Sequence, residues 1–284
     1  MRLTKLEAAD YRNIAHAVLE AGPELTVICG ENGQGKTNLL EAVWLLTGSK
    51  SFRGAKDAEL IGQHAPLARL QGETESAGMK KEIRITVANA QPGMKKGRTA
   101  QVNGVDYGRA TAIAGIFTAV VFEPGHLTLV KGSPEGRRRF IDAALCQLYP
   151  GYLSVFRRYY RQLTQKNALL KLYHKTEGAA ALLEVFDEEL ARLGEEMMRR
   201  RQEYLGVICP EIYRTYHDIS GGRETLSVQY RPTCEPGALL ETLRQSRRRD
   251  VAAGFCTVGP HREDFELSLD ERPAKIYASQ GQQR

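Results

Sequence analysis

The segment that most constrains this chain is a glycine-rich stretch near its N-terminus, Gly30-Glu31-Asn32-Gly33-Gln34-Gly35-Lys36-Thr37. Its spacing, Gly-x4-Gly-Lys-Thr, is that of a phosphate-binding loop. Glycines let the backbone curl so that successive N–H groups point inward around an anion. The helix that follows such a loop adds the partial positive charge of its N-terminus. The stretch therefore predicts an α/β region built around a nucleotide site.

The flanking sequence fits this interpretation. The apolar run Leu25–Cys29 stops at Gly30 and predicts a buried strand, and residues 38–46 predict a buried helix. In such a loop Lys36 reaches the outer phosphates, and Thr37 supplies a hydroxyl to Mg²⁺. The loop thus predicts a phosphate-bearing nucleotide with Mg²⁺ as its ligand.

The loop alone does not separate kinases, GTPases and ATPases. A GTPase would normally carry Asn-Lys-x-Asp, and this motif is missing from the sequence. An ATP-hydrolysing site needs an acidic pair after an apolar strand, and the nearest candidate, residues 120–123, is followed by Pro124. Residues 187–189 (Asp-Glu-Glu) fall inside a predicted helix, where we expect a solvated face. We therefore assign no catalytic acid, and leave open whether the chain is an enzyme.

Composition excludes several other classes. The 284 residues are 42% apolar and 26% charged, enough for a globular core. The longest nearly apolar run, residues 112–122, is too short to span a membrane, and the N-terminus lacks a secretion signal, so we expect a cytoplasmic protein. Five scattered cysteines without a Cys-x-x-Cys pair argue against a disulfide framework or a zinc ribbon.

Two apolar series beyond Pro134 have the 3-and-4 spacing of a helix seam. The first contains Tyr149, Leu153, Phe156, Tyr160, Leu163, Asn167 and Leu170, and the second Leu183, Phe186, Leu190, Leu193, Met197, Arg200, Tyr204 and Val207. A short polar link, residues 174–178, predicts that the helices fold back as an antiparallel arm. Two amphipathic helices in a globular bundle remain the alternative.

The remaining elements give a mixed α/β, then helical, then α/β order. We expect an ATP-binding lobe over residues 1–133, the helical arm over 134–217 as an insertion, and a return to the sheet domain over 218–284. The chain should leave the helical region after Pro210. Strands are predicted at Glu82–Ala88, Phe117–Phe122 (buried), Thr225–Tyr230, Gly254–Val258 and Phe265–Leu269, a hairpin turn at Asn103-Gly104 after Thr99–Val102, and a helix at Leu239–Arg249.

The positive charge of the chain is concentrated in one segment. The net charge is +6, and residues 134–175 contain nine Lys or Arg against two acids. Basic residues are interleaved with aromatic ones at 157–161 (Arg-Arg-Tyr-Tyr-Arg), a pattern typical of nucleic-acid contacts. We name Arg157, Arg158, Arg161 and Lys166 as candidate DNA-binding residues. The alternative is that these side chains only solubilise the outer face of the arm.

Several motifs together resemble a known family. The stretch Gly30–Asn38, preceded by Tyr11-Arg12-Asn13, resembles the ABC-type ATPases of the SMC group. Further matches narrow the resemblance to the RecF family of bacterial recombination and repair proteins: residues 129–134 with 137–142, 258–264 (Val-Gly-Pro-His-Arg-Glu-Asp), and 277–284 (Tyr-Ala-Ser-Gln-Gly-Gln-Gln-Arg).

The resemblance implies an SMC-like head with a helical arm. Such a protein dimerises around ATP, binds single-stranded, gapped or duplex-junction DNA, and acts with RecO and RecR to help load RecA. The stretch from Ser279, with Gly281 and Gln282, is implied to be the ABC signature that faces the nucleotide of the other subunit. Arg12 is implied as a nucleotide contact or is a surface charge at a strand end.

The chain departs from the family pattern at its C-terminus. It ends at Arg284, where the signature helix would begin, and the family's magnesium-binding acids and histidine switch normally follow. We therefore expect a truncated member that contacts nucleotide without detectable turnover, and whose residues 279–284 fray. The family's glutamine at the lobe junction is not placed.

Other motifs in the sequence leave alternatives open. Residues 137–139 (three arginines) either lie at a dimer interface or serve the fold. His261 and Arg262 either contact the nucleotide or a partner subunit, or they fix the turn after Gly-Pro. A P-loop small-molecule kinase and a purely structural nucleotide-binding fragment remain alternatives to a DNA-repair function.

Overall fold

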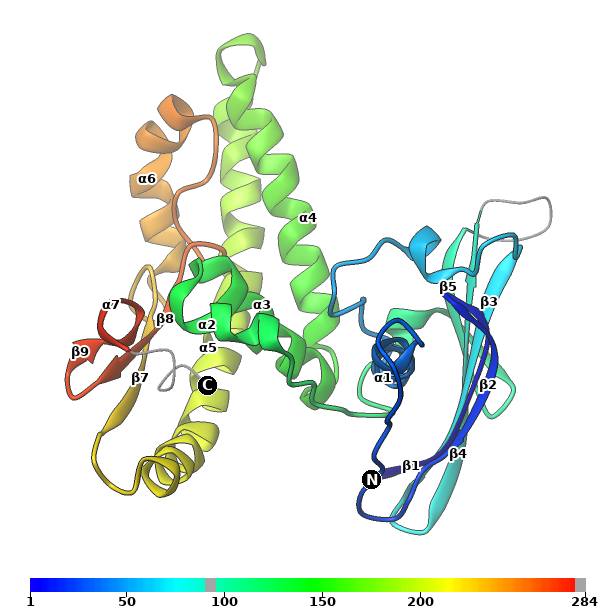
Figure 1. Ribbon diagram of the computed structural model, residues 1–284. Coiled ribbons are helices and arrows are strands. Elements are labelled where there is room, and N and C mark those ends of the chain that lie inside the picture. Colours follow the sequence, from blue (N-terminus) through cyan, green and yellow to red (C-terminus); the bar gives the residue numbers. More distant parts are fainter. Residues whose placement is uncertain (90–95, 279–284) are drawn as a thin grey trace. The chain divides into compact units, whose positions relative to one another are not determined.

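The computed structural model describes residues 1–89 and 96–278. The chain forms two compact units, Met1–Phe122 and Glu123–Arg284 (Figure 1). The expected helical segment 134–217 and the return segment 218–284 both belong to the second unit. In these described ranges no helix combines the length and apolar character that crossing a membrane requires.

A six-stranded antiparallel sheet forms the first unit, in the order β2-β1-β3-β4-β5-β6. The strands are β1 (Arg2–Tyr11), β2 (Ile14–Glu20), β3 (Leu67–Ser76), β4 (Met79–Ala88), β5 (Gly97–Val102) and β6 (Val105–Arg109). The predicted strand at 82–88 and the predicted hairpin are confirmed. Asn103 and Gly104 have φ values of 49° and 78°, which suit the tight turn between β5 and β6. Sequence reasoning missed β1, β2 and β3.

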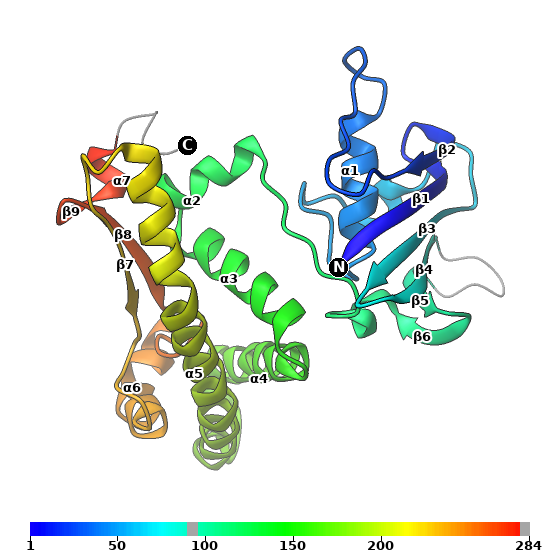
Figure 2. The same ribbon diagram turned by 90° about the horizontal axis from the view of Figure 1, so that it is seen from below.

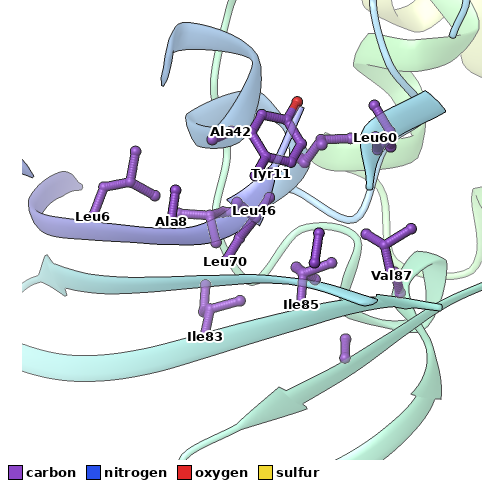
Figure 3. Close-up of a cluster of buried hydrophobic side chains, with 14 of the residues drawn as sticks. Leu6, Ala8, Tyr11, Ala42, Leu46, Leu60, Leu70, Ile83, Ile85 and Val87 are labelled. Atoms are coloured by element: carbon purple, nitrogen blue, oxygen red, sulfur yellow. The ribbon is translucent and has the colours of Figure 1, made fainter. Parts of the chain in front are cut away.

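The core of the first unit lies between one face of this sheet and helix α1 (Lys36–Leu45), which confirms the predicted helix (Figure 3). Along β4 the apolar residues Ile83, Ile85 and Val87 are buried, whereas the polar residues between them are half-exposed. Strand β3 brings Gly72 directly under Leu46. A Cβ added to Gly72 would lie 2.2 Å from Leu46 Cδ1, so the close approach of the α1 end to the sheet requires glycine at this position.

Replacing Gly72 by alanine should therefore destabilise the first unit. We expect Gly72→Ala to lower the free energy of unfolding by about 1–3 kcal/mol, because Leu46 must leave its rotamer or the strand must shift. Chemical denaturation measures the change. The control is Thr86→Ala, which truncates a half-exposed side chain of β4 and should change the unfolding free energy much less. An unchanged midpoint for Gly72→Ala would contradict the tight packing.

Two predicted buried strands are wrong. Residues 25–29 have no strand pairing among the described residues, and Leu25 and Val27 are exposed. Residues 118–122 likewise belong to no strand in the described part of the chain, and Val120 and Phe122 are exposed, although Phe117 is buried. A β-branched apolar run becomes a strand only where a neighbour satisfies its backbone. The pairings of β1 to β6 are all antiparallel, where a mixed sheet was expected.

The second unit combines helices with a small antiparallel sheet, β7-β8-β9. Its elements are α2 (Thr128–Lys131), α3 (Pro134–Leu148), α4 (Tyr152–Lys171), α5 (Ala179–Ser220), β7 (Leu226–Arg231), α6 (Leu239–Ala253), β8 (Asp264–Leu269), β9 (Arg272–Pro273) and α7 (Ala274–Tyr277). Short 3-10 turns lie at Asp57–Leu60 and Ala110–Ile113 in the first unit, and at Pro124–Leu127 and Tyr173–Lys175 in the second. The predictions of β7, α6 and β8 are confirmed. The predicted strand at 254–258 is wrong, because these residues form a turn and irregular backbone after α6.

Helices α4 and α5 form the predicted antiparallel pair, called here the arm (Figures 1 and 2). The pair shares its core with α3 and α6, through Leu145, Leu239 and Leu243. The buried positions differ from the expected seam: Tyr159 and Lys166 are buried on α4, and Arg201 and Leu205 on α5, whereas Val207 is exposed. Packing against α3 and α6 as well as against each other buries a broader face than a two-helix seam.

Helix α5 continues ten residues past Pro210, so the expected end of the helical region there is wrong. Proline removes one backbone hydrogen bond, and the rest of the ladder carries the helix through. The helix ends at Gly221, whose φ of 63° suits glycine, and Gly222 N donates to His217 O at 2.9 Å.

Candidate nucleotide site

The glycine-rich loop has the backbone geometry of an anion cradle. Gly30, Gly33 and Gly35 have φ values of 147°, 86° and 99°, a region that side-chain-bearing residues rarely adopt. Helix α1 begins immediately afterwards, at Lys36. The loop therefore delivers the unpaired N–H groups of the first turn of α1 to the same concave surface, as the motif predicts.

Lys36 is turned back onto the loop. Its ammonium donates to the carbonyl of Gly30 at 2.7 Å and to that of Glu31 at 2.6 Å. These bonds hold the cation within reach of the cradle while satisfying two of its three donors. Thr37, next along α1, is exposed and has its hydroxyl on the first turn.

Side chains from three separate segments support the loop. Asn13 donates from Nδ2 to Gly33 O at 2.9 Å and accepts from Asn38 Nδ2 at 2.7 Å. Asn38 in turn accepts from Arg53 Nη1 at 2.9 Å. This relay fixes the loop to the turn after β1 and places a second cation, Arg53, beside α1.

A cavity of about 290 Å³ lies on this surface. Its lining consists of loop residues, the first residues of α1 and one residue from the segment after α1: Asn32, Gly33, Gly35, Lys36, Thr37, Asn38 and Arg53. Of the predicted residues, Gly30, Glu31 and Gln34 shape the loop without lining the cavity. Sequence reasoning missed Arg53, because only the return of the chain after α1 brings it near Lys36, and no motif marks it.

Arg12 does not stand free at the strand end. Its Nη2 donates to Glu41 Oε1 at 3.0 Å, and the same fully buried carboxylate accepts from the Tyr11 hydroxyl at 2.7 Å and from Ser51. Burial alone would raise the pKa of Glu41, but hydrogen bonds from Arg12, Ser51 and Tyr11 lower it overall. Ser51 Oγ also accepts from the backbone N–H of Arg53. Glu41 thus joins the end of β1, helix α1 and the segment that carries Arg53.

Removing the charge of Glu41 should loosen all three segments. We expect Glu41→Gln to cost about 3 kcal/mol of unfolding free energy, because Arg12 loses its partner in a half-buried site. The pKa of this carboxyl is lower in the folded than in the unfolded chain, so the stabilisation is complete above the unfolded pKa. It is lost as the pH falls through the folded pKa. Denaturation of both proteins at several pH values should show the difference shrinking toward acid, and a constant difference would contradict the charged pair. Glu59→Gln, in a 3-10 turn of the same unit, is the control.

The candidate DNA-binding residues divide into two groups. Arg157, Arg158 and Arg161 are exposed on α4, and Arg158 pairs with Glu189 of α5 at 2.7 Å. Lys166 is fully buried, with its ammonium 2.7 Å from Asp187 and 3.4 Å from Asp250. A buried, paired ammonium cannot reach a DNA phosphate, so Lys166 is removed from the candidate set. Asp187 is also buried, which corrects its expected place on a solvated face.

The Gly-Pro-His-Arg-Glu-Asp motif ties the second unit together. Burial lowers the pKa of His261 to about 4, and its neutral ring accepts from the Tyr159 hydroxyl at 2.7 Å and donates to Cys256 O at 3.1 Å. Glu263 pairs with buried Arg201 at 2.8 Å. Asp264 pairs with Arg137 at 2.8 Å. These contacts favour the turn-fixing interpretation of the motif.

The arginines at 137–139 are largely engaged within the unit. Arg137 is buried and also donates to the carbonyls of Leu129 and Gly132. Arg138 donates to Glu263 O at 2.6 Å, and exposed Arg139 pairs with Glu135 along α3. The first two side chains are therefore committed to the fold.

Comparison with known proteins identifies the family. Residues 2–228 match the family model of the RecF/RecN/SMC N-terminal domain. The DNA replication and repair protein RecF of Synechococcus sp. (strain JA-3-3Ab) is 38% identical over 296 residues, which cover 100% of this chain and 77% of the relative. This chain belongs to the RecF family. The RecF protein of Anaeromyxobacter sp. (strain Fw109-5) is also 38% identical, with the same coverage.

Solved structures of RecF proteins agree with this assignment. The recombination mediator protein RecF with ATP, of the RecFOR pathway, superposes with a TM-score of 0.90 at 30% identity, over 99% of this chain and 76% of that one. An Smc head domain from Pyrococcus furiosus, at 17% identity and a TM-score of 0.50, shares the fold alone. The expected α/β, SMC-like ATPase head is confirmed. The signature residues Ser279, Gly281 and Gln282 lie outside the described residues.

Proposed function

We propose that this RecF-family chain is an ATP-binding, DNA-binding protein of recombinational DNA repair and replication. The single observation that carries the proposal is the glycine cradle at the start of α1, with Lys36 held beside it. Relatives named as DNA replication and repair proteins support the biological role.

In the proposed complex the triphosphate of ATP lies in the cavity along the first turn of α1. Lys36 exchanges its two carbonyl partners for phosphate oxygens, and the backbone amides of residues 33–37 donate to the same anion. Arg53, held by Asn38, adds a second positive charge. The hydroxyl of Thr37 would hold Mg²⁺, which neutralises phosphate charge when bound. Arg12 acts through Glu41 rather than by touching the nucleotide.

The proposed partners follow from the family. We propose that ATP joins two copies of the protein through the stretch Ser279–Gln282 of the opposite subunit, and that RecO and RecR act with it. The pathway named for the RecF structure supports these partners. Single-stranded, gapped or junction DNA is the proposed nucleic-acid partner, and exposed Arg157, Arg158 and Arg161 on α4 are its proposed contacts.

The cradle is tested by removing its cation. We expect Lys36→Ala to weaken ATP binding at least about tenfold, because one charge-assisted contact is worth roughly 1.5–3 kcal/mol. ATP-stimulated binding to gapped DNA should be lost with it. Calorimetry measures the first effect and fluorescence anisotropy the second. Lys50→Ala, an exposed lysine after α1, is the control and should bind normally. Normal ATP affinity in Lys36→Ala would refute the cradle.

The DNA surface is tested separately on α4. Charge removal at Arg157 and Arg161 together (both to Gln) should weaken DNA binding and reduce the salt dependence by about 1.4–1.8 units of log K per log salt, since each lost phosphate contact contributes about 0.7–0.9. Arg214→Gln with Arg231→Gln removes the same charge elsewhere in the second unit. Equal salt slopes in both double variants would place the DNA surface elsewhere.

A further inference from the structure

The segment that follows α6 is held rigidly against α4. Cys256 N donates to the Asn167 side chain at 2.7 Å. The carbonyl of Cys256 accepts from Arg262 Nε at 3.2 Å and from His261 Nε2 at 3.1 Å. Thr257 N donates to Asp250 at 3.0 Å. Four side chains from three elements thus fix a short turn whose conformation needs no ligand to form.

This rigid turn presents an aromatic ring to solvent. Phe255 is 40% exposed, although its neighbours Cys256 and Val258 are buried. The guanidinium of Arg262 lies 4.7 Å from the centre of the ring. The ring is consequently oriented in advance, so a flat ligand group that stacked beside it would not have to order the backbone.

Two further basic side chains contact the turn that carries the ring. Arg249, at the end of α6, donates from Nε to Thr257 Oγ1 at 2.8 Å. Lys171, at the end of α4, packs on Gly254, with its Cγ 3.7 Å from the place of an added Cβ. Asp250, the acid that bonds this turn, is fully buried and pairs with Lys166 and Thr257. Lys171, Arg249 and Arg262 are all exposed, so three cationic side chains accompany Phe255 at this turn.

The cluster continues the proposed DNA surface of α4. At 100° and 1.5 Å per residue, Arg157, Arg161 and Lys171 fall within about 80° of the helix circumference, at intervals of about 6 and 15 Å. The end of α4 leads from these arginines to the turn after α6. Asn167 and Lys171 of α4 contact Cys256 and Gly254, the two neighbours of Phe255, so the ring lies beside the C-terminal end of this helix.

We propose that Phe255, with Lys171, Arg249 and Arg262, forms a stacking contact for single-stranded DNA at the end of the arm. A base stacks against Phe255, and the three cations neutralise the neighbouring phosphates. This inference rests on the proposed DNA-binding function and adds to it a contact that accepts single strands, because bases in a duplex are already stacked.

The combination favours nucleic acid over an acidic protein segment. Carboxylates would use the cations but would gain little from the ring. Every nucleobase has a flat face for an aromatic side chain, and aromatic residues interleaved with basic ones are the usual single-strand platform.

The test compares two equally exposed phenylalanines. Phe140 of α3 is 41% exposed, so Phe140→Ala controls for loss of a surface ring. Binding of a fluorescein-labelled oligo-dT and of a blunt duplex of equal length is measured by anisotropy at several salt concentrations, with ATP present. We expect Phe255→Ala to weaken oligo-dT binding about tenfold, Phe255→Trp to retain it, and Phe140→Ala and duplex binding to change less than twofold. Lys171→Gln with Arg249→Gln should lower the single-strand salt slope by about 1.4.

Each alternative result has a distinct meaning. If wild-type protein binds oligo-dT and Phe255→Ala binds equally well, the stacking contact is wrong and the proposed function stands. If wild-type protein binds neither DNA, the proposed function fails and this inference fails with it. If poly-glutamate binds and loses affinity in Phe255→Ala while oligo-dT does not, the surface serves an acidic protein, which also overturns the inference.

Discussion

The buried carboxylate of Glu41 is the interaction on which the first unit depends. A charge without water around it must be fully paired, and here Tyr11, Arg12 and Ser51 supply the partners. Those partners come from the end of β1 and from the segment after α1. Their convergence fixes where the following residues, Asn13 and Arg53, lie relative to the glycine loop. The glycine loop is therefore positioned by a buried charge that does not itself line the cavity.

The second unit uses the same principle at two places. Lys166 lies between Asp187 and Asp250 and so joins α4, α5 and α6. Arg201 of α5 pairs with Asp142 at 2.8 Å and with Glu263, which joins α3 to the Gly-Pro-His-Arg-Glu-Asp motif. Breaking such a buried pair leaves an uncompensated charge and costs more than losing an apolar contact of similar size. These pairs explain why several basic and acidic residues that look like surface charges in the sequence serve the fold.

Features that are determined by residues close together in the sequence could be predicted, whereas features that depend on distant segments could not. The glycine loop was predictable because its φ values and the start of α1 are set within eight residues. Arg53 was not, since its place depends on chain segments that meet only in the fold. Lys166 was expected to contact DNA, whereas in the fold its ammonium pairs with two carboxylates inside the bundle. Residues 25–29 have strand-like side chains, but composition says nothing about whether a neighbouring backbone is present to pair with them.

The inward turn of Lys36 has a consequence for ligand choice. Its ammonium already donates to two carbonyl oxygens of the loop. Any incoming anion must therefore compete with these carbonyls for the hydrogen bonds of Lys36. A weakly charged anion gains little from that exchange, whereas a polyphosphate offers several strong acceptors at once. The loop is therefore expected to favour anions of high charge density before any contact with a base is made.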